Sequence, residues 1–108
     1  MTAALARDDE ADRMLRALSE QRRRSILRLV RERELPAGRI AEEFDVTRSA
    51  VSQHLAVLKE AGLVTERRDG TRRLYRARPE AMVRVQAALD AIWSDALDRG
   101  RALVEAER

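Results

Sequence analysis

TRSAVSQHLAVLKEAGLV, residues 47–64, is patterned as an amphipathic helix with an uncharged outer face. At about 100° per residue, its apolar side carries Val51, Leu55, Leu58 and Ala61. Its opposite side carries small or hydrogen-bonding residues, which are Ser49, Ser52, Gln53 and Ala56. A helix face that meets only water normally carries more charge. This outer face therefore calls for an explanation other than solvation.

The sequence after this helix changes from helical to strand periodicity. Gly62 suits the position just past a helix end, where a positive φ is required. Residues 63–67 and 72–76 then read as two strands, and Asp69-Gly70 between them is a strong signal for a β-hairpin turn. The sequence thus predicts a helix followed by a two-stranded ribbon.

Arginine is concentrated in this ribbon. The segment 64–78 holds six arginines against Glu66 and Asp69, whereas the surrounding helices mix both signs. Such a local excess is the electrostatic footprint of an element that faces phosphates. The whole chain has 21 arginines, a single lysine and a net charge of +3. Its overall arginine excess has a second explanation, the composition of a GC-rich genome.

Three further helices are expected before residue 47. The first is marked by Ala11, Met14, Leu15 and Leu18. Ser19 offers an N-cap for the second, whose apolar face is Ile26, Leu27 and Val30. Pro36 suits the first turn of a short third helix, AGRIAEEF, packed through Ile40, Ala41 and Phe44. A break at Asp45-Val46 separates it from the next helix, which Thr47 caps.

A long final helix is expected to begin near Glu80, after Pro79. Its apolar side carries Met82, Val85, Leu89, Ile92, Trp93, Ala96 and Leu103. A helix of roughly 27 residues is about 40 Å long, more than so small a domain covers by itself. We therefore expect this side to meet a second subunit, together with Met14, Leu15 and Leu18 of the first helix. The alternative is packing of the last helix on the first within one chain.

Composition limits the class of protein. The 108 residues, 44% hydrophobic and 38% charged, suit one small globular domain. No stretch approaches the roughly 18 consecutive apolar residues of a membrane span, and the N-terminus lacks the apolar core of a signal peptide, so we expect the cytoplasm and no membrane partner. Without cysteine there is no disulfide, thiolate metal site or thiol switch.

The order of elements predicts a winged helix-turn-helix, mainly α with a β-hairpin wing. It comprises five helices in a single domain, 1–108, dimeric through helices at about 10–18 and 80–107. In such a fold the second helix of the pair enters the DNA major groove and the wing follows the backbone or minor groove. Small Ser49, Ser52 and Ala56 then permit close approach to base edges, and Gln53 is suited to bond adenine. The alternative for this helix is a generic surface helix.

No catalytic or metal site is expected. His54 lies at the edge of the buried stripe, where it either donates to a phosphate or packs against its neighbours. It is the only histidine, and zinc needs three or four ligands. Asp90, Asp95 and Asp98 have the spacing of solvated surface on a helix. The serines lack the histidine and acid partners of a nucleophile, so neither an enzyme nor a cofactor is predicted.

From about Asp12 to Arg101 the sequence resembles the ArsR family of small bacterial winged-helix repressors. The resemblance rests on LSEQRRRSILRLV, RIAEEFDVTRSAVSQHLAVLKEAGLV and RRDGTRRLYRARPE. It implies a homodimer that binds an operator of inverted symmetry, an imperfect palindrome in double-stranded DNA, and is released by an effector. It also implies recognition-helix contacts at Arg48, Ser49, Ser52, Gln53 and His54, and wing contacts at Arg68, Arg72 and Arg73.

Sensing is where the sequence departs from many relatives. It lacks both the cysteines and the histidine–carboxylate pairs of the metal sensors, and is similar instead to the metal-independent branch, which includes members with a tryptophan on the last helix. The sequence does not identify an effector. A sequence-specific regulator, most simply a repressor, is the leading hypothesis. The alternative is a winged-helix module for protein–protein interaction without DNA binding.

Overall fold

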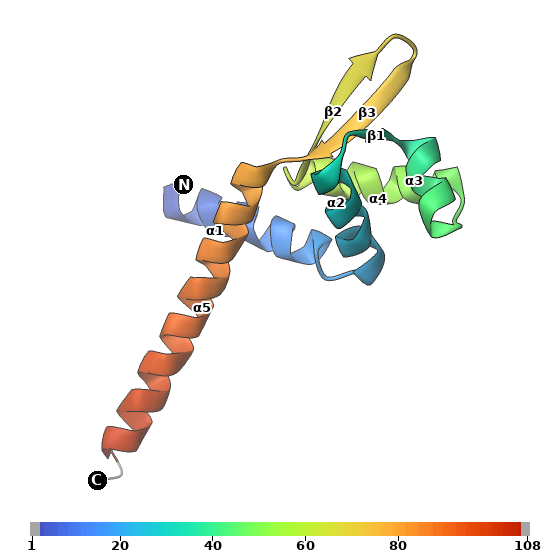
Figure 1. The fold of residues 1–108 in the computed structure, drawn as a ribbon. Helices are drawn as coiled ribbons and strands as arrows, with labels where there is room; N and C mark the ends of the chain where they lie inside the picture. Colours follow the sequence, from blue (N-terminus) through green and yellow to red (C-terminus); the bar gives the residue numbers. More distant parts are fainter. Residues whose placement is uncertain (1–2, 107–108) are drawn as a thin grey trace.

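A computed structural model describes residues 3–106, with five helices and three strands (Figure 1). In chain order these are α1 (Ala3–Ala17), α2 (Gln21–Glu32), β1 (Leu35–Pro36), α3 (Ala37–Phe44), α4 (Arg48–Glu60), β2 (Val64–Asp69), β3 (Arg72–Ala77) and α5 (Pro79–Ala106). The winged helix-turn-helix and its five helices are confirmed. The first helix extends further toward the N-terminus than the expected start near residue 10.

The core lies between α1, α2, α3, α4 and the start of α5, beside β2 and β3. Its largest members, each at most 1% exposed, are Met14, Ile26, Val30, Ile40, Val51, Leu55, Leu58 and Leu63. The predicted apolar side of α4 is therefore confirmed, because its residues are buried at helical spacing. At the start of α4 the hydroxyl of Thr47 accepts a hydrogen bond from the Ala50 N–H at 3.1 Å, as a capping residue does.

The turn between α3 and α4 depends on Asp45. Its φ of 51° is left-handed, a conformation that aspartate tolerates better than most residues. The following Val46 N–H donates to the Ala41 carbonyl at 3.2 Å, which closes the end of α3. The predicted break at Asp45-Val46 is thus confirmed and has a backbone cause.

The wing is an antiparallel hairpin in a sheet of order β1-β3-β2. The hairpin register runs from Val64↔Ala77 to Asp69↔Arg72, which leaves Gly70 and Thr71 as the two-residue turn. The predicted β-hairpin is confirmed, but its turn lies one residue later than Asp69-Gly70, since Asp69 is paired and Gly70, at φ 66°, is the first residue of the loop.

Two features before α3 differ from expectation. Leu35 and Pro36 form a short edge strand paired with Tyr75 and Leu74 of β3, so Pro36 precedes the third helix rather than lying in its first turn. Ser19 does not cap α2, because its hydroxyl donates to the Arg16 carbonyl at 2.6 Å and Glu20 occupies the cap position.

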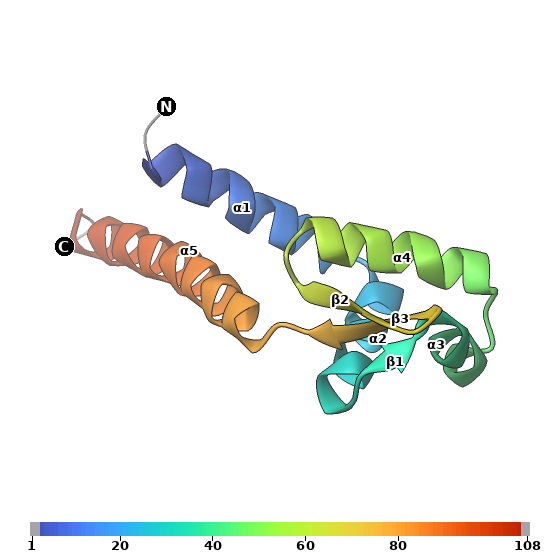
Figure 2. The same cartoon turned by 90° about the horizontal axis from the view of Figure 1, so that it is seen from above.

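Helix α5 leaves the globular part of the chain as a long arm (Figures 1 and 2). Its first turns pack on α1, where Ala81 and Val85 join Met14 in the core. Residues 91–101 of α5 are all exposed, so packing within the chain explains only its beginning. None of the described helices is both long enough and apolar enough to cross a membrane.

Candidate nucleic-acid interface

The outer face of α4 is free of contacts with the core. This face carries four exposed side chains, which are Arg48, Ser49, Ser52 and Gln53, whereas the opposite side of the helix is buried. His54 is half-buried at the edge of this face, as its position beside the apolar stripe predicted. The N-terminal half of α4 therefore presents short polar side chains and one arginine to the outside.

The wing and α4 border one open depression. Its volume is about 630 Å³, and it is lined from α4 by Arg48 and Ser52 and from the wing by Thr71, Arg72, Arg73 and Tyr75. Arg39 and Glu42 of α3 join them on the third side, where Arg39 Nη1 lies 3.5 Å from Glu42 Oε2. The structure thus brings four of the predicted contact residues together, whereas Ser49, Gln53, His54 and Arg68 are not among the residues that line the depression.

Arg68 lies directly across the hairpin from Arg73. Like charges in cross-strand positions are destabilising, so this pair reduces the stability of the isolated hairpin. Arg73 has a partial counter-charge, because its Nε lies 3.7 Å from Glu66 Oε1. A juxtaposition of this kind is favourable when an anion lies against both guanidinium groups.

Glu66 links the wing to the recognition helix. One of its carboxylate oxygens lies 3.4 Å from Lys59 Nζ at the end of α4, and the other faces Arg73 of β3. Desolvation opposes ionisation of Glu66, but hydrogen bonds with Lys59 and Tyr75 outweigh it and lower the pKa of the carboxyl. Glu66 therefore connects the wing with the C-terminal end of α4.

A second ion pair holds the other side of the wing. Arg67 donates from Nη2 to Glu34 Oε1 at 2.6 Å and from Nε to Oε2 at 3.1 Å. These hydrogen bonds keep the pKa of the Glu34 carboxyl below its ordinary value of 4.5, against an opposing effect of desolvation. This fork geometry joins β2 to the residue that precedes β1.

Acidification is expected to release the Glu34–Arg67 pair. A lowered pKa means that the pair stabilises the fold above pH 4.5 and that this contribution is lost as the pH falls through the lower folded value. The Arg67 Nε–H resonance, followed by NMR from pH 6 downward, should shift with a midpoint below 4.5. Glu34→Gln should remove that transition, and a midpoint at or above 4.5 would contradict the assignment.

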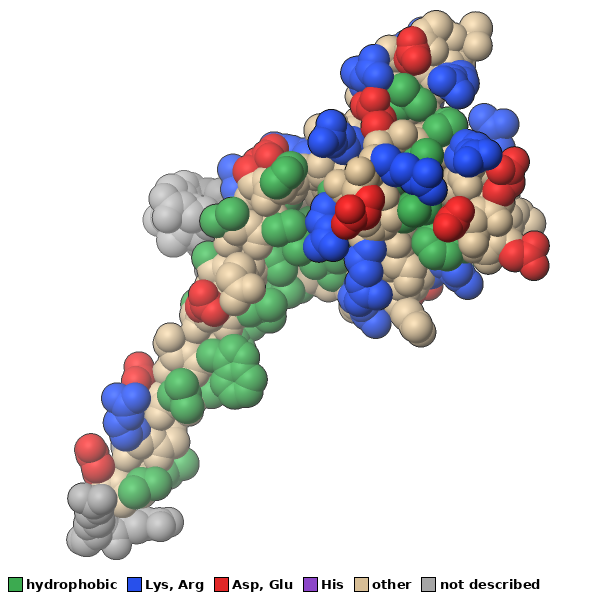
Figure 3. Space-filling view, viewed as in Figure 1, with side chains coloured by type: hydrophobic (Ala, Val, Ile, Leu, Met, Phe, Trp, Pro, Cys, Tyr) green, Lys and Arg blue, Asp and Glu red, His purple; other side chains and the backbone are tan. Residues whose placement is uncertain are grey.

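The residues expected at the dimer seam fall into two groups. Met14 and Val85 are 1% and 5% exposed, buried within the single chain, and Leu15 and Leu18 pack beside them. Leu89, Ile92, Trp93 and Ala96 instead lie on the open part of α5. Ile92 and Trp93 are 56% and 66% exposed, and Leu97, Leu103 and Val104 extend the same apolar side (Figure 3).

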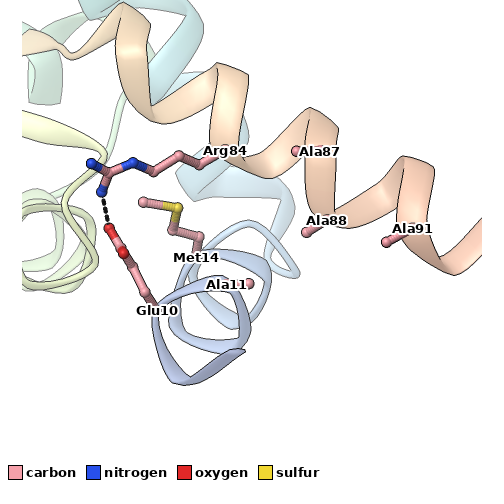
Figure 4. A pocket seen from close by; sticks show the side chains of 7 residues that line it. All are labelled: Glu10, Ala11, Met14, Arg84, Ala87, Ala88 and Ala91. Carbon is pink, nitrogen blue, oxygen red and sulfur yellow. Dashed lines mark hydrogen bonds and ion pairs between the residues drawn. The ribbon is translucent and has the colours of Figure 1, made fainter. Parts of the chain in front are cut away.

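The junction of α1 and α5 is lined by small side chains. Glu10 of α1 pairs with Arg84 of α5 beside Met14, while Ala87, Ala88 and Ala91 follow one another along α5 (Figure 4). Together these residues border a depression of about 540 Å³. The ion pair thus connects α1 and α5 at this exposed junction.

Comparison with known proteins identifies the class. Residues 20–66 match the family model for the bacterial regulatory proteins of the arsR family. The chain is also 40% identical over 96 residues to the HTH-type transcriptional regulator Rv2034 from Mycobacterium tuberculosis, across 89% of this chain and 90% of that protein. The chain belongs to the ArsR family. It is a transcriptional regulator with a winged helix-turn-helix DNA-binding domain, and not an enzyme.

Two further relatives bear on ArsR function and assembly. The transcriptional repressor SdpR from Bacillus subtilis is 37% identical over 57 residues, across 53% of this chain and 63% of that protein. The solved structure of a homodimeric winged helix-turn-helix DNA-binding domain, Mb0332 from Mycobacterium bovis, matches with a TM-score of 0.72. Its sequence is 31% identical, and the match covers 92% of each chain.

Several residues of this ArsR-family interface were not found from the sequence. Arg39, Thr71 and Tyr75 line the depression, while Glu34 and Glu66 hold the wing. The pair that includes Glu34 joins residues 33 positions apart, which no local pattern reveals. Within residues 3–106, no group of three or more His, Cys, Asp or Glu side chains is arranged to hold a metal ion.

Proposed function

We propose that this ArsR-family protein is a homodimeric, sequence-specific repressor whose α4 enters the major groove of its operator. The observation that carries the proposal is the depression shared by α4 and the wing, with Arg48 and Ser52 on one side and Arg72 and Arg73 on the other. A sugar–phosphate backbone that passes through it contacts both elements at once. Repression follows if the operator overlaps a promoter.

The residues of this surface have different tasks in the proposal. Ser49 and Ser52 are short enough for the α4 backbone to approach base edges, and Gln53 offers the donor and acceptor that pair with adenine. Arg48, Arg68, Arg72 and Arg73 supply charge to phosphates, which gives affinity without sequence preference. Half-buried His54 donates to a phosphate at the edge of the same face.

Dimerisation completes the proposed DNA-binding unit. We assign the dimer seam to α1 and α5, with the open apolar side of α5 in contact with the partner. Ile92 and Trp93 of α5 are exposed, and large exposed apolar side chains that lie together usually mark an interface. The homodimeric Mb0332 domain supports this assignment. Two-fold symmetry then predicts an imperfect palindrome with half-sites about 10 bp, or a multiple of that, apart.

The proposed regulator does not sense a metal directly. The chain has no cysteine and a single histidine, so a symmetric dimer offers at most two imidazoles besides carboxylates. The repressor SdpR supports the direction of regulation. The proposed binding to operator DNA also implies a cytoplasmic location.

Selection of duplexes from a random library is the experiment that tests the function. We expect recovery of a palindromic site, and Gln53→Ala should lower affinity for that site by about 1–3 kcal/mol while leaving random duplexes unaffected. Affinities are to be measured by fluorescence anisotropy at several salt concentrations.

Arg72→Ala is the matched control for this substitution. It should weaken all duplexes similarly and flatten the dependence of affinity on salt, because it removes a phosphate contact. Equal losses on selected and random duplexes for Gln53→Ala would refute its role as a base contact. Absence of any salt-dependent duplex binding would instead favour a protein-interaction module.

A further inference from the structure

A second depression lies outside the proposed DNA-binding surface. It has a volume of about 500 Å³, is open to solvent, and is bordered by α2, the end of β3 and the start of α5. None of the residues that line it also lines the depression between α4 and the wing. Its size is in the range of roughly 300–1,000 Å³ that small-molecule sites occupy.

The floor of this α2–β3–α5 depression is apolar. Leu27 and Ala77 are 7% and 9% exposed, so they form a closed base. Leu18 and Pro79 border that base, and Met82 is 39% exposed beside it. Methionine adapts its shape to irregular ligands, which makes it common at apolar binding surfaces. Such a floor accepts a hydrocarbon chain or ring.

The rim is made of arginines. Arg24, Arg28 and Arg31 project from one side of α2 because they stand four and three residues apart, and Arg76 of β3 faces the same space. No acidic residue lines the depression. Figure 3 shows blue side chains gathered beside the green ones where the globular part meets α5.

The four rim arginines differ in their partners within the chain. Arg24 donates from Nη1 to the Leu18 carbonyl at 2.7 Å, and Arg31 pairs with Glu32 at 3.3 Å. Among the described residues, the guanidinium groups of Arg28 and Arg76 make neither a hydrogen bond nor an ion pair within the chain. Arg76 acts on Glu34 only through its charge.

We propose that this depression binds a small amphipathic carboxylate, with its hydrocarbon part on the floor and its carboxylate between Arg28 and Arg76. Arginine suits a carboxylate because its planar fork offers paired N–H donors. The apolar floor discriminates against small hydrophilic anions, and the arginine rim against neutral hydrocarbons.

The position of the depression makes its occupant a regulator. β3 is one of the two strands of the wing, and the start of α5 leads into the proposed dimer seam, so a bound molecule contacts both elements. An occupant that binds one relative orientation of these elements more tightly shifts the population toward it. This second step rests on the proposed function, whereas binding itself does not.

Calorimetric titration of the full chain without DNA tests the binding. The probe is decanoate below its micelle concentration, compared with decanol for the missing charge and acetate for the missing chain. We expect one decanoate per chain, bound at least about tenfold more tightly than either comparison compound. Multiple weak binding, or equal affinity for decanol, would overturn the proposal.

Variants locate the site. Arg28→Gln and Arg76→Gln should each weaken decanoate about tenfold, while Arg33→Gln, an equal charge change at the exposed end of the same helix, should leave it unchanged. Circular dichroism checks that the variants keep the helical fold. Equal effects of all three substitutions would overturn the assignment to this depression.

Operator binding measured with and without decanoate tests the regulatory step. We expect saturating decanoate to change operator affinity at least about fivefold in the wild type and not in Arg28→Gln. Unchanged operator affinity would overturn the regulatory step. Competition between decanoate and a non-operator duplex would overturn the carboxylate site in favour of a DNA contact. Failure to bind any duplex would refute the proposed function, and the calorimetry without DNA would still decide the site.

Discussion

Leu58→Ala is expected to lower the free energy of unfolding by about 2–5 kcal/mol, the cost of truncating a buried leucine where the surroundings relax only partly. Leu58 is 0% exposed, on the side of α4 that packs into the core. The free energy of unfolding of a small domain is only about 5–15 kcal/mol, so the variant should be partly unfolded near physiological temperature. Urea denaturation followed by circular dichroism gives the measurement.

Val57→Ala is the matched control, one position earlier on the same helix. Val57 is 39% exposed, so its truncation removes fewer packed contacts and should cost much less than that of Leu58. Both variants must be compared at equal protein concentration, because the proposed dimerisation would make apparent stability concentration-dependent. Equal costs at the two positions would contradict the burial of α4 described above.

The helix-turn-helix was predictable because its signals are local. Val51, Leu55 and Leu58 recur at helical spacing, and Thr47 is the kind of residue that caps a helix. The structure confirms both features. The turn of the hairpin was located to within one residue, because the turn residues identify a hairpin more reliably than its register.

The short strand β1 could not be predicted, because a segment of two residues shows no periodicity. Leu35 and Pro36 become a strand only when β3 lies beside them, which is a tertiary event. The prediction that Ser19 caps α2 is wrong for a related reason. A serine bonds whichever backbone group the chain brings near, and here that is the Arg16 carbonyl.

The candidate site was predictable only in part. The arginines of the wing and the small outer face of α4 follow from composition and spacing, but the carboxylates that orient the wing come from distant positions in the chain. Apolar spacing alone also does not tell whether a residue is covered by its own chain or by a partner. Met14 and Val85 lie in the chain's own core, and Trp93 does not.

Trp93→Ala should weaken dimerisation and operator binding together. Trp93 is 66% exposed in the single chain and lies within the open apolar side of α5, where a partner is proposed to cover it. Truncation of a buried aromatic anchor at an interface commonly costs 2 kcal/mol or more, about a thirtyfold change in the dissociation constant. Sedimentation equilibrium across a range of concentrations measures that constant.

Asp98→Ala is the control, because Asp98 is exposed about 140° around the same helix from Trp93 and should lie outside the seam. It should leave the dimer unchanged.

Since α4 and the wing lie far from Trp93 along the chain, Trp93→Ala should keep non-specific DNA binding while cooperative occupation of both half-sites declines. A wild-type monomer at tens of micromolar, or full affinity of one protomer for a half-site, would refute the dimer. An unchanged dimer in Trp93→Ala would move the seam away from this side of α5.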